Sequence, residues 1–180
     1  MRSVSGYFVA VILRPSRAAS LLTLAVATML LSGCAPAPEP TPTATPVFAS
    51  EEEAFAAAEE VYRAYNEAGN ADGSGTDYLT ASALQGELDT TRYLSENGLR
   101  LQGASLITSF TGVSSDLVSA PTSVEASVCL DLTAVRVLDA SGADVTPSDR
   151  ANVLALSVKF VESDDHLLIS ESERVEDSAC

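Results

Sequence analysis

The spacing of apolar residues changes once along the chain, and this change restricts the possible folds more than any other feature. Before residue 99 the apolar residues of the folded part recur every three or four positions, as on the buried side of a helix. After residue 99 they alternate with polar residues, as in strands with one buried face. Helices followed by strands predict an α+β domain, with N-terminal helices packed on one face of a four-stranded antiparallel sheet.

Two helices are expected in the first half. Ser50 and the three glutamates after it form a capping box that places acidic groups at the positive end of a helix. This helix should end at Gly69, and a second should run from Thr80, as its N-cap, to Gly98. The stripe that the first helix should bury comprises Ala54, Phe55, Ala58, Val61, Tyr62, Tyr65 and Ala68.

Four strands are expected in the second half. The first covers residues 99–111, and its apolar phase shifts near Gly103, which indicates a bulge. The others cover residues 124–132, 154–160 and 167–175.

The N-terminal segment has the layout of a secretory signal. Three arginines precede an apolar run over residues 18–31, which is shorter than the ~20 residues of a transmembrane helix. An uncleaved anchor helix is the alternative. We expect residues 1–33 to be a signal peptide.

The segment Leu31-Ser32-Gly33-Cys34 resembles the lipobox of bacterial lipoproteins. This resemblance implies that a diacylglycerol is attached to Cys34 and that the leader is cut before it. The alternative, a free or buried thiol, has no apolar surroundings here. The expected location is the extracytoplasmic face of the cell membrane, held by the lipid on Cys34.

Residues 34–50 separate this anchor from the domain over 51–180. The segment is rich in proline and threonine, which favours an extended polyproline II spacer. O-linked sugars or a proline-recognition ligand are alternative interpretations of the same composition.

The charge of the chain excludes one class of partner. Lys and Arg number 10 against 25 Asp and Glu, and the net charge is −15. Nucleic-acid binding requires clustered basic residues to neutralise phosphates, so we expect no nucleic-acid partner.

Two cysteines remain in the domain. In an exported chain, Cys129 and Cys180 are expected to form a disulfide, with two free thiols as the alternative. They lack the C-x-x-C spacing of a reactive redox pair.

Three blocks of the domain carry a resemblance to a known family. They are YLTASALQGELDTTRYLSENGLRLQG, VCLDLTAVRVLDASGADVTPSDRANVLALSVKF and ISESERVEDSAC. Together with the order helix, helix, sheet, they resemble secreted actinobacterial lipoproteins with a nuclear transport factor 2-like, cystatin-like cone domain. The resemblance implies helices in the concave side of a curved sheet and a pocket at its wide end. Some members are isomerases or dehydratases, and many are binding or accessory domains.

Candidates for catalysis or metal binding are few, and we assign no catalytic residue, metal or cofactor. The single histidine, His166, falls in a turn, and Asp131 is expected on the sheet surface. The oxygens of Asp139 and Asp144 lack calcium-loop spacing and indicate a hairpin turn, with a calcium site as the alternative. Arg150 is expected to pair with a neighbouring acid.

Tyrosines are the best pocket candidates, because an aromatic ring with a polar tip suits a half-wet cleft. They are Tyr62, Tyr65, Tyr78 and Tyr93, with ordinary core packing as the alternative. The sequence therefore predicts a tethered, non-catalytic module that binds an unidentified small molecule or envelope protein. The alternative is a cone-fold enzyme, which two facing titratable groups in the pocket would favour.

Overall fold

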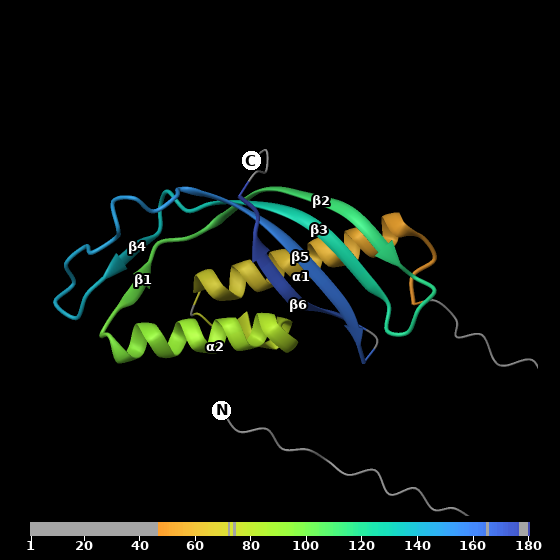
Figure 1. Ribbon diagram of the computed structural model, residues 1–180, viewed down its shortest axis with the longest axis horizontal. Coiled ribbons are helices and arrows are strands. Elements are labelled where there is room, and N and C mark those ends of the chain that lie inside the picture. The colour runs from red at the N-terminus through yellow and green to blue at the C-terminus, as the bar shows by residue number, and fades with distance from the viewer. Residues whose placement is uncertain (1–46, 72, 74, 165, 177–179) are drawn as a thin grey trace, which may run out of the picture. The chain divides into compact units, whose positions relative to one another are not determined.

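The computed structural model describes residues 47–71, 73, 75–164, 166–176 and 180. The expected signal peptide, the lipidation site Cys34 and most of the spacer lie outside these residues. Within the described part, no helix is long and apolar enough to cross a membrane. The described part is an α+β domain of two α-helices and antiparallel strands (Figure 1).

Helix α1, Glu51–Ala71, begins where its capping residues predict. The Oγ atom of Ser50 accepts a hydrogen bond from the Glu53 backbone N–H at 3.2 Å, and Glu53 accepts one from the Ala49 N–H at 2.8 Å. These bonds satisfy N–H groups that a helix leaves free at its start. The helix ends two residues beyond the expected Gly69, within the usual variation of helix ends.

Helix α2, Ala81–Glu96, follows a short 3-10 helix, Gly75–Tyr78, and buries none of its residues. Its N-cap is Thr80, as expected, but the Thr80 side chain makes no capping bond. Instead the Thr80 backbone N–H donates to the Ile169 carbonyl at 2.8 Å, and the Ser82 hydroxyl donates to the Ser170 carbonyl at 3.0 Å. The start of α2 is therefore attached to the last strand.

The main sheet has four antiparallel strands in the order β2-β3-β5-β6. Their bounds are β2 Leu106–Asp116, β3 Ser123–Asp131, β5 Val153–Ser163 and β6 His166–Arg174. The last three coincide closely with the strands expected from alternation. The four-stranded antiparallel sheet is confirmed.

The first expected strand is corrected by the structure. Residues 99–111 do not form one bulged strand, because the chain leaves the main sheet at Gly103. Before this point β1, Arg100–Gln102, pairs with β4, Arg136–Leu138, in a separate two-stranded ribbon. Gly103 has φ of 97° and faces the Ala134 carbonyl so closely that a Cβ atom would lie 2.1 Å from its oxygen. Only glycine fits this turn without strain.

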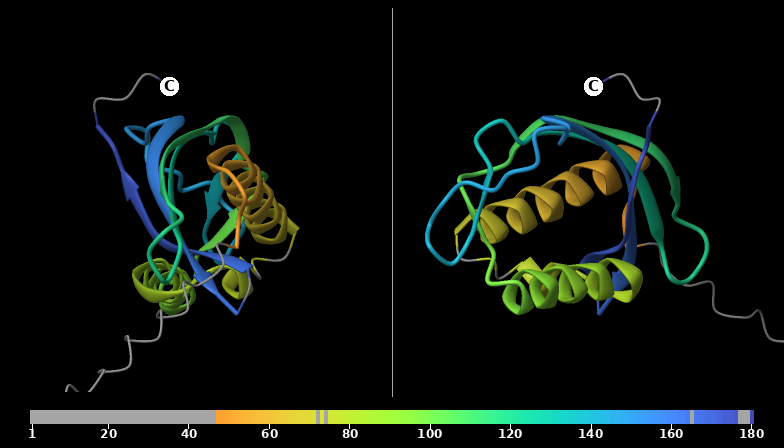
Figure 2. Two further views of the ribbon diagram at one scale, coloured as in Figure 1. Left: turned by 90° about the vertical axis from the view of Figure 1, so that its right-hand side faces the viewer. Right: turned by 60° about the vertical axis from the view of Figure 1, so that its left-hand side comes forward.

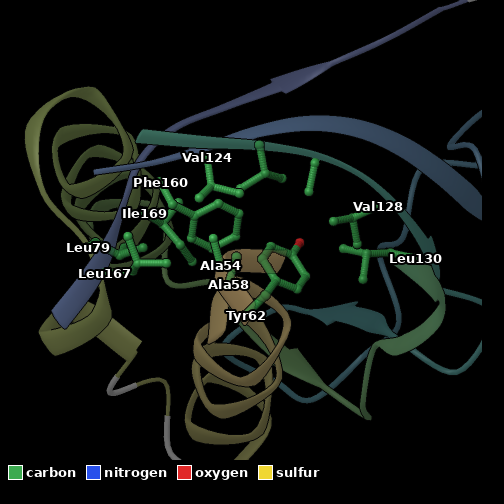
Figure 3. Packing of buried hydrophobic residues seen from close by; sticks show 12 residues of the cluster. Ala54, Ala58, Tyr62, Leu79, Val124, Val128, Leu130, Phe160, Leu167 and Ile169 are labelled. Atoms are coloured by element: carbon green, nitrogen blue, oxygen red, sulfur yellow. The ribbon is translucent and has the colours of Figure 1, made fainter. Parts of the chain in front are cut away.

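The core lies between α1 and the concave face of the sheet, which bends around this helix (Figure 2). The inward-facing positions of β3 and β5 alternate, as their sequences predict. Figure 3 shows this cluster, in which buried residues of α1 pack against residues of β3, β5 and β6. The largest fully buried side chains are Phe160, Ile169, Val124, Val128 and Val158.

Candidate functional site

A cavity of about 410 Å³ lies between the two helices, the sheet and the β1–β4 ribbon. This volume falls within the roughly 300–1,000 Å³ of small-molecule pockets. Its apolar wall comes from the strands and the loops next to them: Leu101, Leu130, Leu132, Val135, Val137 and Leu156. Its polar side chains are mainly on the helices and include Tyr62, Tyr65, Asn66, Asn70, Glu87 and Arg150. The helix side of the site is therefore polar, and the strand side is mainly apolar, with Arg150 beside Leu132.

Two of the four candidate tyrosines meet at this cavity. Tyr62 and Tyr65 lie on α1 with ring centroids 5.8 Å apart in an edge-to-face arrangement. Tyr62 is only 2% exposed, and its hydroxyl points into the space between α1 and the sheet, toward the side of Val128 and Leu130 (Figure 3). Both line the cavity.

The other two candidate tyrosines do not line this cavity. Tyr78 is half-buried in the 3-10 helix, and Tyr93 is 60% exposed on α2. The structure thus separates them from Tyr62 and Tyr65.

Burial keeps the two cavity tyrosines protonated. Desolvation raises the pKa of Tyr62 above its usual value, and the nearby Tyr65 raises it further. Desolvation, followed by the charge and hydrogen bond of Glu87, raises the pKa of Tyr65 to about 12. At neutral pH both phenols are therefore hydrogen-bond donors and cannot act as bases.

The Tyr65 hydroxyl donates to the Glu87 carboxylate, with 3.4 Å between Oη and Oε2. Glu87 also lines a groove of about 760 Å³ between the helices and β1, and a smaller hollow of about 250 Å³ beside β6. Glu87 lines the cavity and both hollows, and Tyr65 lines the cavity and the smaller hollow. Their hydrogen bond brings together two titratable groups that the sequence could not pair, because they are 22 residues apart on different helices.

A hydrogen-bonded cluster closes one edge of the cavity. Asn70 Nδ2 donates to the Ser105 carbonyl at 2.9 Å, and the Ser105 backbone N–H donates to Asn70 Oδ1 at 2.9 Å. The Ser105 hydroxyl donates to Asn66 Oδ1 at 2.6 Å. These bonds attach the end of α1 to the start of β2, so the cluster shapes the cavity. The only sequence signal for it is the pair of asparagines four residues apart on one helix face.

Arg150 brings a positive charge to the cavity wall. Its Nη2 atom donates to the Leu132 carbonyl at 3.0 Å, whereas its Nε atom is buried and has no hydrogen-bond partner. The expected pairing with a neighbouring acid is not found among the described residues. The nearby Asp144 pairs instead with Arg136, at 3.4 Å. The physical reason is that Arg150 is half-buried at the cavity, whereas Arg136, on β4, and Asp144 are both exposed.

The remaining catalytic and metal candidates are surface residues. His166 is exposed at the start of β6, and its Nδ1 atom lies 3.0 Å from the Asp164 carbonyl oxygen. Asp139 Oδ1 accepts hydrogen bonds from the Ser141 and Ala143 N–H groups at 2.8 and 3.0 Å, which makes this segment a turn. Across the residues that the structure describes, no three acidic, histidine or cysteine side chains are placed to hold a metal ion.

Cys129 and Cys180 form the expected disulfide, with their Cα atoms 5.6 Å apart. Cys129 lies at a position of β3 that alternates with the core residues Val128 and Leu130. The bond therefore joins the end of the chain to the central part of the sheet.

Comparisons with known proteins define no family for this chain. No protein-family model matches it, and no curated protein does. Among solved structures, it is similar to the crystal structure of the intermembrane space region of the chloroplast protein ARC6. The likeness has 16% sequence identity and a TM-score of 0.48, and it covers 70% of this chain and 96% of that one.

Proposed function

We propose that the chain is a lipid-anchored, extracytoplasmic binding module whose cavity takes a small amphipathic molecule. One observation carries this proposal: the cavity has an apolar wall on the strand side and a polar wall on the helix side. Such a lining suits a ligand that is itself apolar on one side and polar on the other.

The chemistry of the polar wall favours binding over catalysis. Tyr62 and Tyr65 are held protonated by burial; Tyr65 donates its hydrogen bond to Glu87, so Tyr62 is the phenol that donates to a ligand. The asparagine cluster is occupied by Ser105. Among the described residues, Glu87 is the one acidic side chain lining the cavity, and no second titratable carboxylate or histidine faces it there.

We also propose that the domain has the nuclear transport factor 2-like cone fold. The order of helices and strands and the position of α1 in the concave side of a curved sheet support this assignment (Figure 2). A cavity between the helices and the sheet also supports this assignment.

Anchoring rests on the Leu31-Ser32-Gly33-Cys34 segment, and the disulfide supports an oxidising location outside the cytoplasm. The test is Cys34→Ala in a bacterial host that exports and lipidates such proteins, with Ala37→Ser as the control. The Cys34→Ala protein should leave the membrane fraction and carry no acyl chains by mass spectrometry. If the Cys34→Ala protein sediments with membranes and keeps its leader, the proposed lipid anchor on Cys34 is wrong.

Ligand binding is tested by native mass spectrometry of the purified full chain. Leu156 is half-buried at the cavity wall, so Leu156→Trp should fill the cavity and abolish a copurifying small molecule. Val113 on β2 is 63% exposed, and Val113→Trp is the matched control that should retain the molecule. Equal retention by both folded variants contradicts binding in this cavity.

The Tyr65–Glu87 pair supports a second candidate, a cone-fold enzyme with Glu87 as the acid or base. Glu87→Gln separates the two functions. A non-catalytic module should copurify with the same compound in both forms, whereas an inactive enzyme accumulates its substrate. A different ligand mass in the Glu87→Gln protein therefore favours the enzyme.

A further inference from the structure

We infer that the ligand of this cavity carries an anionic group, such as a carboxylate, and that Arg150 binds it while the apolar body of the ligand lies against the strands. This inference rests on the proposed function, since it names the chemical class of the ligand for the same cavity. Arg150 is a binding residue in this assignment and has no part in a reaction.

The first support is the incomplete set of partners around Arg150. A guanidinium has five N–H donors and no acceptor. The only hydrogen bond of the Arg150 side chain to another described residue goes from Nη2 to the Leu132 carbonyl, which is neutral. Nε is buried without a partner. A half-buried cation that lacks an anionic partner is costly, so an anion that enters the cavity gains from pairing with it.

The second support is that two acids of this region, Glu87 and Asp144, make other interactions. Glu87, which lines the same cavity, accepts the hydrogen bond of Tyr65. Asp144 accepts a hydrogen bond from the Thr146 N–H at 2.9 Å and pairs with Arg136, and these interactions hold its pKa below the usual range, with the charge of Arg150 contributing least. Neither carboxylate lies within 4.0 Å of the Arg150 guanidinium. Arg150 is thus available to a ligand.

The third support is the neighbourhood of Arg150 within the cavity. Leu132, whose carbonyl it binds, lines the cavity together with Leu130, Val135 and Leu156. A ligand whose charged end lies on Arg150 therefore meets an apolar surface next to it. The net charge of −15 repels anions from the protein as a whole, so an anion is retained only by a specific contact.

Isothermal titration calorimetry of the full chain with three probes tests this inference. The probes are decanoate, decanol and decyltrimethylammonium, which share a ten-carbon chain and differ in the charge of the head group. The wild-type protein should bind decanoate at least tenfold more tightly than the other two. Arg150→Gln should weaken decanoate binding by about tenfold or more and change decanol binding by less than about twofold, because the apolar wall is kept.

Two further variants serve as controls. Arg92→Gln removes the same charge from the exposed face of α2, where Arg92 pairs with Asp89, and it should leave decanoate binding unchanged. Arg150→Lys keeps the charge without the planar fork and should have an intermediate affinity. If Arg150→Gln does not fold, Arg150→Lys and the three probes on the wild type still decide the question.

The outcomes separate the inference from the proposed function. If the wild type binds all three probes equally, or if Arg150→Gln weakens all of them equally, the anionic ligand is wrong and the binding module stands. If no probe binds the wild type, amphipathic binding itself is wrong and the inference falls with it.

Discussion

The ring of Phe55 on α1 lies directly against the backbone of Gly112 on β2. A Cβ atom at Gly112 would lie 2.3 Å from Cγ of Phe55 and 2.5 Å from its Cδ1. Cγ is the base of the ring, so a small rotation of the side chain cannot clear it. The absence of a side chain at Gly112 allows α1 to approach the concave face of the sheet this closely.

Gly112→Ala should therefore destabilise the domain by about 1–3 kcal/mol, because it overpacks this contact. Equilibrium urea unfolding measures the effect. In a Phe55→Ala background the same substitution should cost at least about 1 kcal/mol less, since the two residues are in contact. The control is Gly86→Ala on α2, where a Cβ meets nothing within 4 Å and helix propensity should add about 1 kcal/mol of stability. Additive effects of the two substitutions contradict the contact.

Gly103→Ala should be more damaging, costing about 3–5 kcal/mol, because a close backbone contact is added to an unfavourable φ. Gly142→Ala is the matched control. Gly142 has φ of 85°, but its nearest neighbour atom would lie 3.8 Å from a new Cβ, so only the strain of about 1–2 kcal/mol applies. Urea unfolding of both variants gives the comparison. Equal costs would mean that the approach to Ala134 does not determine the break between β1 and β2.

The disulfide should stabilise the domain by about 4 kcal/mol in the chain-entropy model, given its sequence separation of 51 residues. Cys129→Ser and Cys180→Ser should each lose this amount, and the double variant should lose no more. The native protein should leave Cys129 and Cys180 unreactive toward a maleimide unless it is reduced. Reaction of both thiols in the native protein contradicts the bond.

The buried phenols make stability depend on alkaline pH. The pKa of Tyr65 is about 12 in the folded protein against a usual value of 10.0. Below pH 10 the Tyr65 hydroxyl keeps its proton in both the folded and the unfolded chain, so the free energy of unfolding is not reduced by its ionisation. Between pH 10 and 12 the unfolded chain releases a proton that the folded protein retains, so stability falls.

Tyr65→Phe cannot ionise, so it should lose less stability than the wild type between pH 9 and pH 11 in urea unfolding. Tyr93→Phe is the control for a tyrosine at an exposed position, and it should follow the wild type. Identical pH dependence in all three proteins would show that burial of Tyr65 does not perturb its ionisation.

Local signals in the sequence were sufficient for most of the fold. The start of α1 follows from its capping residues, and β3, β5 and β6 follow from alternation, because these patterns depend only on neighbours along the chain. The disulfide was also predictable, since residues 51–180 contain only two cysteines. The extent of α2 was predicted too, but its lack of buried residues was not.

Contacts between distant segments decided the rest. Gly103, between β1 and β2, packs against the carbonyl of Ala134, 31 residues later, and this contact leaves no space for a side chain. The cavity joins Tyr65 to Glu87 and places Arg150 beside Leu132, and none of these pairs follows a local repeat. The sequence by itself determined which segments become helices and strands. Only the tertiary structure decided which polar groups share a cavity and which of them lack a partner there, because those relationships arise when the sheet bends around α1.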